Sequence, residues 1–279
     1  MKLRSLASGS SGNCVYIQGR TTRLLVDAGY SGRKIETLMK QAEVDPKRID
    51  AILVTHEHID HIAGVGVLSR RYHIPIYANR ATWEAMSRKV GRIPDEHRKI
   101  FRNAEPFTIR EIQVLPVPVH HDAADPVGYT FTAGSEKICV VTDTGFVDEP
   151  LLEQMSGADI YYFEANYEDL LLQNGSYSYW SKKRISSEIG HLSNHQSAEA
   201  LCRLLEGRGE QVVLAHMSIN NNTTRCCYQS VSEYLEAQGF TMGKGVHVLV
   251  APREAPSPLF DAAEIRARGA ASEAAVFCC

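Results

Sequence analysis

Short apolar runs separated by turn-forming residues recur along the chain, a pattern typical of strands in an α/β fold. We expect strands over residues 3–7, 13–19, 22–27, 51–55, 74–78, 111–119, 127–133, 137–142, 159–163, 212–216 and 246–250. Apolar positions with a helical period predict helices over residues 31–42, 60–71, 80–90, 148–155, 195–207 and 224–238. Segments 91–105 and 173–190 follow neither pattern and are expected to be irregular insertions. The pattern therefore predicts β-rich halves with helices on their outer sides.

The character of the chain changes after Pro252. Residues 253–279 are rich in Ala, Glu, Arg and Pro and end in Phe277-Cys278-Cys279. We expect residues 1–252 to form one domain, and residues 253–279 to be a loosely held tail with a short helix at 261–268.

Bulk composition excludes several classes of protein. Hydrophobic residues make up 44% and charged residues 23% of the 279 residues, as in an ordinary globular protein. A net charge of −3 argues against coating nucleic acid by bulk charge, although a local basic groove stays open. The seven cysteines are odd in number and scattered, which favours a reduced, cytoplasmic setting over a disulfide framework. No apolar run is long enough to span a bilayer, so we expect no membrane association.

One short segment carries most of the candidate chemistry. His56, His58, Asp60 and His61 follow the predicted buried strand 51–55 in the pattern H-x-H-x-D-H. On an extended chain His56 and His58 leave on the same side, while Asp60 and His61 can point to a second centre where a helix begins. A histidine-rich surface loop is the alternative, but it explains this spacing poorly. The segment therefore predicts a metal site.

Further candidate ligands stand at other predicted strand ends. His121, Asp143 and His216 each follow an apolar run, as the first cluster does. The carboxyl ends of strands are where α/β sheets place their chemistry. Spacing cannot separate His121 from its neighbour His120. Imidazole and carboxylate ligands without thiolate suit zinc, manganese or iron.

These motifs resemble the metallo-β-lactamase superfamily, and their order resembles its nuclease branch, most closely the YycJ/WalJ-type group. The resemblance covers about residues 1–252 and includes the stretches LASGSSGNC (6–14), LLVDAG (24–29), GHLSN (190–194) and AHMSINNN (215–222). It implies an α/β fold, a four-layer αββα sandwich. It also implies two divalent ions, zinc or manganese, with iron possible.

By position, the resemblance assigns roles to individual residues. It implies that His56, His58 and His121 hold one ion, that Asp60, His61 and His216 hold the other, and that Asp143 bridges them. Asp27 resembles an aspartate that braces the metal loop from behind. A simple turn at the end of strand 22–27 would explain Asp27 equally well.

Glu164 and His191 form a second candidate pair. In phosphodiesterase members such as RNase Z, a similar histidine protonates the leaving oxygen and a similar glutamate orients it. Such a proton donor is what a departing alkoxide needs. The alternative is a histidine bonded locally near a helix start.

Several residues are candidates for contact with nucleic acid. Tyr179 and Trp180 stand beside Lys182, Lys183 and Arg184, which combines base stacking with phosphate binding. Ser10, Ser11 and Asn13 lie in a donor-rich loop, and Asn194 lies near a helix start that could hold a phosphate. A partly packed loop and a structural turn are the alternatives.

The resulting hypothesis is a dinuclear phosphodiesterase in which Asp60, His191 and Glu164 are catalytic. The resemblance implies a 5′-to-3′ exonuclease that acts on DNA rather than RNA, and it suggests a role in repair. A ribonuclease, or a thioesterase, lactonase or β-lactamase on the same site, remains the alternative. A non-catalytic, metal-stabilised regulatory protein is a further one, but seven N/O ligands favour an open catalytic site. The sequence indicates no oligomeric state.

Overall fold

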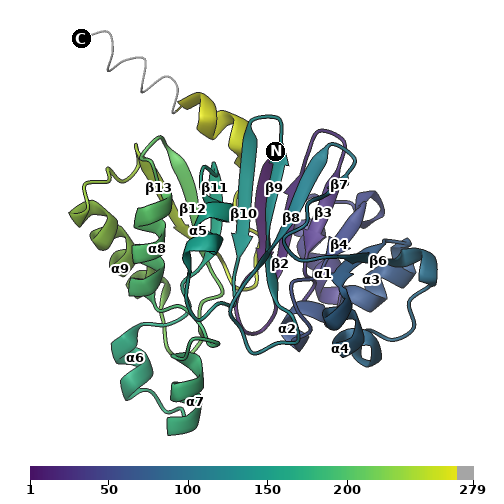
Figure 1. The fold of residues 1–279 in the computed structure, drawn as a ribbon, viewed down its shortest axis with the longest axis horizontal. Coiled ribbons are helices and arrows are strands. Elements are labelled where there is room, and N and C mark those ends of the chain that lie inside the picture. The colour runs from purple at the N-terminus through teal and green to yellow at the C-terminus, as the bar shows by residue number, and fades with distance from the viewer. Residues whose placement is uncertain (269–279) are drawn as a thin grey trace.

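The apolar runs form two sheets that pack face to face, with helices on both outer sides (Figure 1). This computed structural model describes residues 1–268. The strands of the first sheet lie in the order β14-β1-β2-β3-β4-β5-β6. They span β1 (Lys2–Ala7), β2 (Cys14–Gln18), β3 (Arg23–Val26), β4 (Ala51–Leu53), β5 (Ile76–Asn79), β6 (Arg98–Phe101) and β14 (Phe260–Asp261).

The second sheet has the strand order β13-β12-β11-β10-β9-β8-β7. Its strands are β7 (Phe107–Ile109), β8 (Ile112–Pro118), β9 (Val127–Ala133), β10 (Glu136–Val141), β11 (Ile160–Glu164), β12 (Glu210–Ala215) and β13 (Val246–Val250). The α-helices of the described chain are α1 (Gly32–Gln41), α2 (Ile59–Ile62), α3 (Val65–Tyr72), α4 (Arg80–Val90), α5 (Glu149–Met155), α6 (Asp169–Asn174), α7 (Tyr179–Ile185), α8 (Asn194–Leu204) and α9 (Thr224–Ala237).

Three apolar clusters separate the four layers. Leu53 and Tyr162 belong to the cluster between the two sheets. The outer face of the first sheet buries side chains of α1, α3 and α4, including Leu38 and Trp83. The outer face of the second sheet packs on α5, α8 and α9 through residues such as Leu201. The predicted αββα sandwich is therefore confirmed.

Parallel pairing brings the functional loops to one edge. In the first sheet β3, β4, β5 and β6 pair in parallel, and in the second sheet β10, β11, β12 and β13 do the same. The carboxyl ends of parallel strands meet at one edge of a sheet, and this is where such folds bind ligands. The loops that follow β3, β4, β10, β11 and β12 carry most of the predicted site residues.

Two expectations about secondary structure were wrong. The helix expected over residues 60–71 is two helices, α2 and α3, with a break before Gly64. A Cβ at Gly64 would lie 2.5 Å from the carbonyl oxygen of Tyr30, and the amide of Gly64 donates to Ala28, so the 28–30 loop occupies the space that a continuous helix would need.

The segments expected to be irregular contain β6 and α7. β6 is an edge strand whose first three residues are exposed, so it lacks the alternation that marks a half-buried strand.

The C-terminal segment also differs from expectation. Strand β14 pairs with β1, and the following helical residues 262–268 bury Ala262 and Ile265 between the two sheets. Residues 253–268 are therefore not loosely held, because their few apolar side chains complete the end of the core. Cys278 and Cys279 lie outside the described residues. None of the helices in residues 1–268 is long and apolar enough to cross a membrane.

Candidate metal centre

Three histidines form the first group of candidate ligands. His56 and His58 follow β4, and their rings meet edge to face with centroids 4.6 Å apart. His121 follows β8, and its ring lies 5.2 Å from His56 and 5.1 Å from His58. One ring nitrogen from each histidine lies within 4.8 Å of the other two. The geometry fits a single ion held by three imidazoles.

The second group joins the start of α2 to the end of β12. Asp60, His61 and His216 each offer one ligand atom, and these atoms also lie within 4.8 Å of one another. Oδ2 of Asp60 lies 3.6 Å from Nε2 of His61 and 3.6 Å from Nε2 of His216. This group could hold a second ion beside the first.

Asp143 lies between the two groups. Its Oδ2 lies 3.4 Å from Nε2 of His61, and its Oδ1 lies 3.4 Å from His216 and 3.8 Å from His121. One carboxylate therefore reaches histidines of both groups. The structure brings together all seven residues that the sequence suggested as ligands.

The buried polar atoms of the cluster fit metal ions. Nε2 of His56, Nε2 of His216 and Oδ2 of Asp143 are buried and have no hydrogen-bond partner among residues 1–268. An unpaired buried polar atom costs about 1–3 kcal/mol, so three of them facing one another call for a compensating ligand. Divalent cations are compensating ligands for imidazole and carboxylate together.

Protein groups on the far side of the rings orient several of the histidines. Nδ1 of His56 lies 3.0 Å from Oγ1 of Thr55, and Nδ1 of His121 lies 3.0 Å from the carbonyl oxygen of Gly190. Such outer contacts set the tautomer and leave Nε2 free as a ligand.

Asp27 connects the metal loop to the end of β3. Its Oδ1 accepts the amide of Thr55 at 2.9 Å, its Oδ2 accepts the hydroxyl of Thr55 at 2.8 Å, and Oδ2 also lies 2.7 Å from Nδ1 of His61. Asp27 is 3% exposed, so no solvent competes for these bonds. The carboxylate of Asp27 therefore links the end of β3 to both Thr55 and His61 of the loop that carries the candidate ligands.

Three residues of the centre have left-handed backbone conformations. The φ angles are 60° at Asp27, 59° at Asp143 and 53° at His216. Residues other than glycine rarely adopt positive φ, and the strain costs about 1–3 kcal/mol at each site. All three lie just after strands that lead into the cluster, where a sharp turn aims the side chain across the sheet edge.

Carboxylates give the centre a strong preference for positive charge. Burial alone would lower the pKa of His61, but Asp143, Asp27 and Asp60 raise this pKa to about 9. Burial opposes ionisation of Asp143 as well, yet His216, His61, His56 and His121 hold its pKa well below the usual range. Burial and His61 lower the pKa of His56, which favours the neutral imidazole that binds metal.

Glu164 and His191 lie at the border of the cluster. Oε1 of Glu164 lies 2.8 Å from Nδ1 of His191 and 3.1 Å from Nδ1 of His216. Glu164 is fully buried, and its Oε2 accepts the amide of Thr144 at 2.9 Å. The side chain of His191 is 12% exposed and lies 3.8 Å from Asp143. The pair is therefore fixed beside the candidate ligands, with the histidine on the solvent side.

The structure also separates His120 from His121. His120 stacks on Phe146 with ring centroids 3.9 Å apart, and its Nε2 lies 3.0 Å from Asp148. It points away from the cluster, whereas His121 is one of the grouped ligands.

Two of the suggested nucleic-acid contacts are internal. Asn13 is 5% exposed and joins the amide of Gly9 to the backbone of Asp60. Asn194 is 1% exposed and donates to Glu168. Both side chains are used within the fold, so the structure does not present them to a ligand. Ser10, Ser11, Tyr179, Trp180, Lys183 and Arg184 are exposed, and Lys182 is partly exposed.

Asn166 is a contributor that the sequence did not single out. Its side-chain amide donates to the carbonyl oxygen of His216 at 2.7 Å and lies 3.3 Å from Nδ1 of the same residue. It thereby supports the left-handed turn at His216. The available signal was its position in YYFEANY, two residues after Glu164 at the end of a buried strand.

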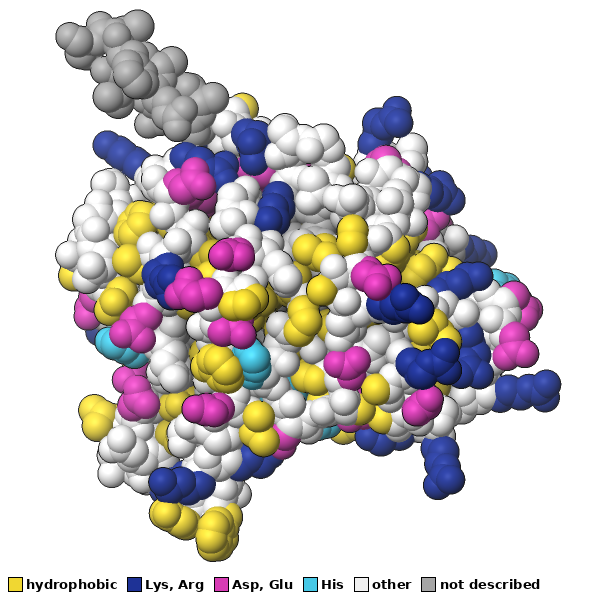
Figure 2. Space-filling model, viewed as in Figure 1, with side chains coloured by type: hydrophobic (Ala, Val, Ile, Leu, Met, Phe, Trp, Pro, Cys, Tyr) yellow, Lys and Arg dark blue, Asp and Glu magenta, His cyan; other side chains and the backbone are white. Residues whose placement is uncertain are grey.

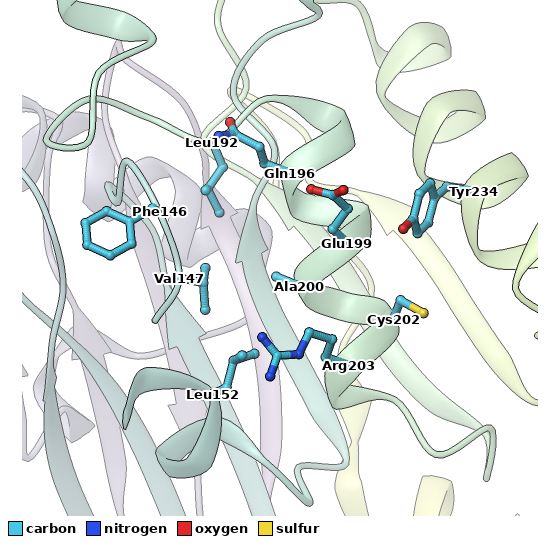
Figure 3. A pocket seen from close by; sticks show the side chains of 10 residues that line it. All are labelled: Phe146, Val147, Leu152, Leu192, Gln196, Glu199, Ala200, Cys202, Arg203 and Tyr234. Carbon is cyan, nitrogen blue, oxygen red and sulfur yellow. The ribbon is translucent and has the colours of Figure 1, made fainter. Parts of the chain in front are cut away.

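A separate pocket of about 450 Å³ lies between α5, α8 and α9 (Figure 3). Its lining contains none of the grouped ligands, and Arg203 at its rim pairs with Glu149. The lining residues are Phe146, Val147, Leu152, Leu192, Gln196, Glu199, Ala200, Cys202, Arg203 and Tyr234. The candidate metal ligands therefore lie outside this pocket.

Comparison with known proteins agrees with the fold and the cluster. A family model described as a beta-lactamase superfamily domain matches residues 22–217, a span that includes all seven candidate ligands. The chain belongs to the metallo-β-lactamase superfamily.

Two curated relatives are similar over nearly their whole length. The chain is 41% identical to the exodeoxyribonuclease YycJ of Bacillus anthracis over 243 residues, which is 87% of this chain and 92% of that protein. It is 38% identical to the exodeoxyribonuclease WalJ of Streptococcus pneumoniae over 92% of this chain and 97% of that protein.

A solved structure supports the fold alone. The metallo-β-lactamase fold protein YhfI of Bacillus subtilis superposes with a TM-score of 0.71 at 18% identity, covering 93% of this chain and 98% of that one.

Proposed function

We propose that this protein is a dinuclear-metal phosphodiesterase that removes nucleotides from DNA in the 5′-to-3′ direction. The observation that carries the proposal is the buried Glu164–His191 pair at the border of a seven-residue cluster of ligands. A thioester leaves as a thiolate and needs no such proton donor, whereas the alkoxide that departs from a phosphodiester does. Substantial identity to two exodeoxyribonucleases supports DNA as the polymer.

The candidate ligands would hold two ions, zinc or manganese. His56, His58 and His121 would hold one, Asp60, His61 and His216 the other, and Asp143 would contact both. Bound divalent ions would neutralise phosphoryl oxygens and lower the pKa of an attacking water toward about 7.

The protein's own groups handle the protons. Asp60, with a side chain 20% exposed, reaches the edge of the site and accepts a proton from the attacking water. Glu164 accepts a hydrogen bond from Nδ1 of His191 and holds the ring in place. Nε2 of His191 then donates its proton to the leaving oxygen as the phosphorus–oxygen bond breaks.

A substrate panel tests the proposal. The purified protein with manganese is given DNA labelled at either end, RNA of the same sequence, a thioester and a lactone, alongside Asp60→Ala. We expect labelled mononucleotide from the 5′ end of DNA first, with wild type only. Hydrolysis of the thioester or lactone without cleavage of DNA would refute the proposal, and preferential cleavage of RNA would reassign the polymer.

A further inference from the structure

Helices α6 and α7 project from the body of the molecule beyond the second sheet (Figure 1). A small core of Tyr167, Leu172 and Ile185 holds the two helices together. Ser178 caps the start of α7 by accepting the amide of Ser181. The projection is thus a structured element with its own packing.

Two aromatic side chains stand unburied on this element. Trp180 is 79% exposed and Tyr179 is 64% exposed, and their rings meet edge to face at 5.4 Å. Exposed large aromatics next to each other are uncommon on the surface of a protein that acts alone, and they mark contact sites. The chain has only one other tryptophan, Trp83, which is 2% exposed.

Basic groups accompany the aromatics. Nζ of Lys183 lies 5.8 Å from the centre of the Tyr179 ring, and Lys182 is on the same short helix. Nζ of Lys182 donates to the carbonyl oxygen of Gln173 at 2.7 Å, and neither lysine forms an ion pair with a carboxylate of residues 1–268. Figure 2 shows hydrophobic and basic side chains side by side at the end of the projection. Exposed aromatics beside unpaired cations fit bases linked by phosphates better than an apolar protein surface.

The projection is directly connected to the candidate metal centre. Arg184 forms a two-pronged ion pair with Asp122, at 2.6 and 2.8 Å, and Asp122 is adjacent to His121. The amide of His191 donates to the carbonyl oxygen of Ile185, the last residue of α7. The helix that carries the aromatics is therefore hydrogen-bonded to the segment that carries His191, the proposed proton donor.

We propose that Tyr179 and Trp180 form a stacking platform for unpaired nucleobases of the DNA strand that enters the metal centre. This inference rests on the proposed function and assigns a substrate-binding surface to it. Base–aromatic stacking tolerates any sequence, which suits an enzyme that removes nucleotides one after another.

Tryptophan fluorescence tests the platform without turnover. A single-stranded oligonucleotide with hydrolysis-resistant phosphorothioate linkages is titrated into the metal-loaded protein, and a fully abasic strand of equal length is the control ligand. We expect the base-containing strand to quench Trp180 and to bind at least about fivefold more tightly than the abasic strand. Trp83 is buried, so its emission should change little.

Variants separate stacking from charge. Trp180→Ala should bind the base-containing strand at least about fivefold more weakly and leave binding of the abasic strand unchanged, while Trp180→Phe should restore part of the difference. Leu170→Ala removes another exposed apolar side chain, 66% exposed on α6, and should have no effect.

Equal affinity of wild type and Trp180→Ala for both strands would overturn the proposal. So would a change in sedimentation of Trp180→Ala without a change in DNA affinity, since it would mark the aromatics as an interface between copies.

A small phosphodiester, bis(p-nitrophenyl) phosphate, distinguishes this proposal from the proposed function. Wild type and Trp180→Ala should hydrolyse it equally, because it is a single phosphodiester without the run of nucleobases that the platform would hold. If wild type hydrolyses the small phosphodiester but Trp180→Ala binds DNA as tightly as wild type, only the platform proposal is refuted. If the metal-loaded wild type hydrolyses neither the small phosphodiester nor DNA, the proposed function is refuted. The fluorescence titration would still show whether Tyr179 and Trp180 bind nucleobases.

Discussion

The carboxylate of Glu164 lies 2.8 Å from Nδ1 of His191 and is fully enclosed by the protein. A buried carboxylate that accepts from one ring nitrogen of a histidine fixes the orientation of the ring, and the other ring nitrogen then faces the site. The same Glu164 oxygen lies 3.1 Å from Nδ1 of His216. One oxygen of Glu164 therefore contacts both His191, the proposed proton donor, and the candidate metal ligand His216.

Replacing His191, the proposed proton donor, should lower the hydrolysis rate most for substrates whose leaving group needs a proton. We expect His191→Ala to lower the rate of DNA hydrolysis about 10²- to 10⁴-fold. Hydrolysis of bis(p-nitrophenyl) phosphate should fall much less, because p-nitrophenolate leaves without a proton. His195→Ala is the matched control, since His195 is 60% exposed, pairs with Glu199 and belongs to none of the candidate ligand groups. Equal losses on both substrates would show that His191 acts on the metals or on the fold instead.

The charge of Asp27 should set metal affinity through His61. We expect Asp27→Asn to weaken metal binding about 10- to 100-fold while excess metal restores much of the activity. Asparagine tolerates the φ of 60° at this position, so the backbone strain is nearly unchanged. Metal titration followed by calorimetry measures the effect, with Asp45→Asn as a surface control. Unchanged affinity would contradict the bracing role.

Gly29 should tolerate no side chain. A Cβ at this position would collide with the backbone carbonyl of Asp60 and lie 2.6 Å from the amide nitrogen of Asn13. We expect Gly29→Ala to destabilise the fold by about 1–3 kcal/mol and to lower activity, because relief requires moving Asp60. Gly134→Ala is the comparison, since nothing lies within 4 Å of its Cβ and only its φ of 61° resists substitution. Denaturant unfolding and activity together test this, and a fully active Gly29→Ala would contradict it.

Glu111 should make stability depend on pH at the end of the molecule away from the metals. Partial burial opposes its ionisation, but the amides and hydroxyls of Thr21 and Thr22 hold its pKa below the ordinary value of 4.5. A carboxyl whose pKa is lowered by folding contributes stability above the unfolded pKa and loses it as the pH falls. Glu111→Gln should therefore have a lower melting temperature than wild type at pH 7, and the difference should shrink below about pH 4.5. A difference that stays constant down to pH 3 would contradict this.

The candidate ligands could be proposed from the sequence because each stands next to a recognisable local pattern. His56, His58, Asp60 and His61 share a single segment, and Asp143 and His216 each follow a continuous apolar run. Spacing could not separate His121 from His120. The family resemblance favoured His121, and the stacking of His120 on Phe146 shows that the ring of His120 turns away.

Other features depend on contacts between distant segments and left little trace in the sequence. Asn13 and Asn194 have polar side chains typical of surface loops, yet both are buried by hydrogen bonds to partners far along the chain or across a turn. The left-handed turns at Asp27, Asp143 and His216 likewise could not be predicted, because none of these positions is a glycine. The edge strand β14 forms only because β1 offers it a partner more than 250 residues away in sequence.

The most direct test of the account is to titrate chelator-treated protein with manganese or zinc while measuring both bound metal and hydrolysis of 5′-labelled DNA. The account predicts that two equivalents bind per chain, that hydrolysis reaches its maximum only with the second, and that Asp143→Ala loses both. Full activity with one equivalent, or hydrolysis that persists after the metal is removed, would contradict a two-ion centre built from these seven residues.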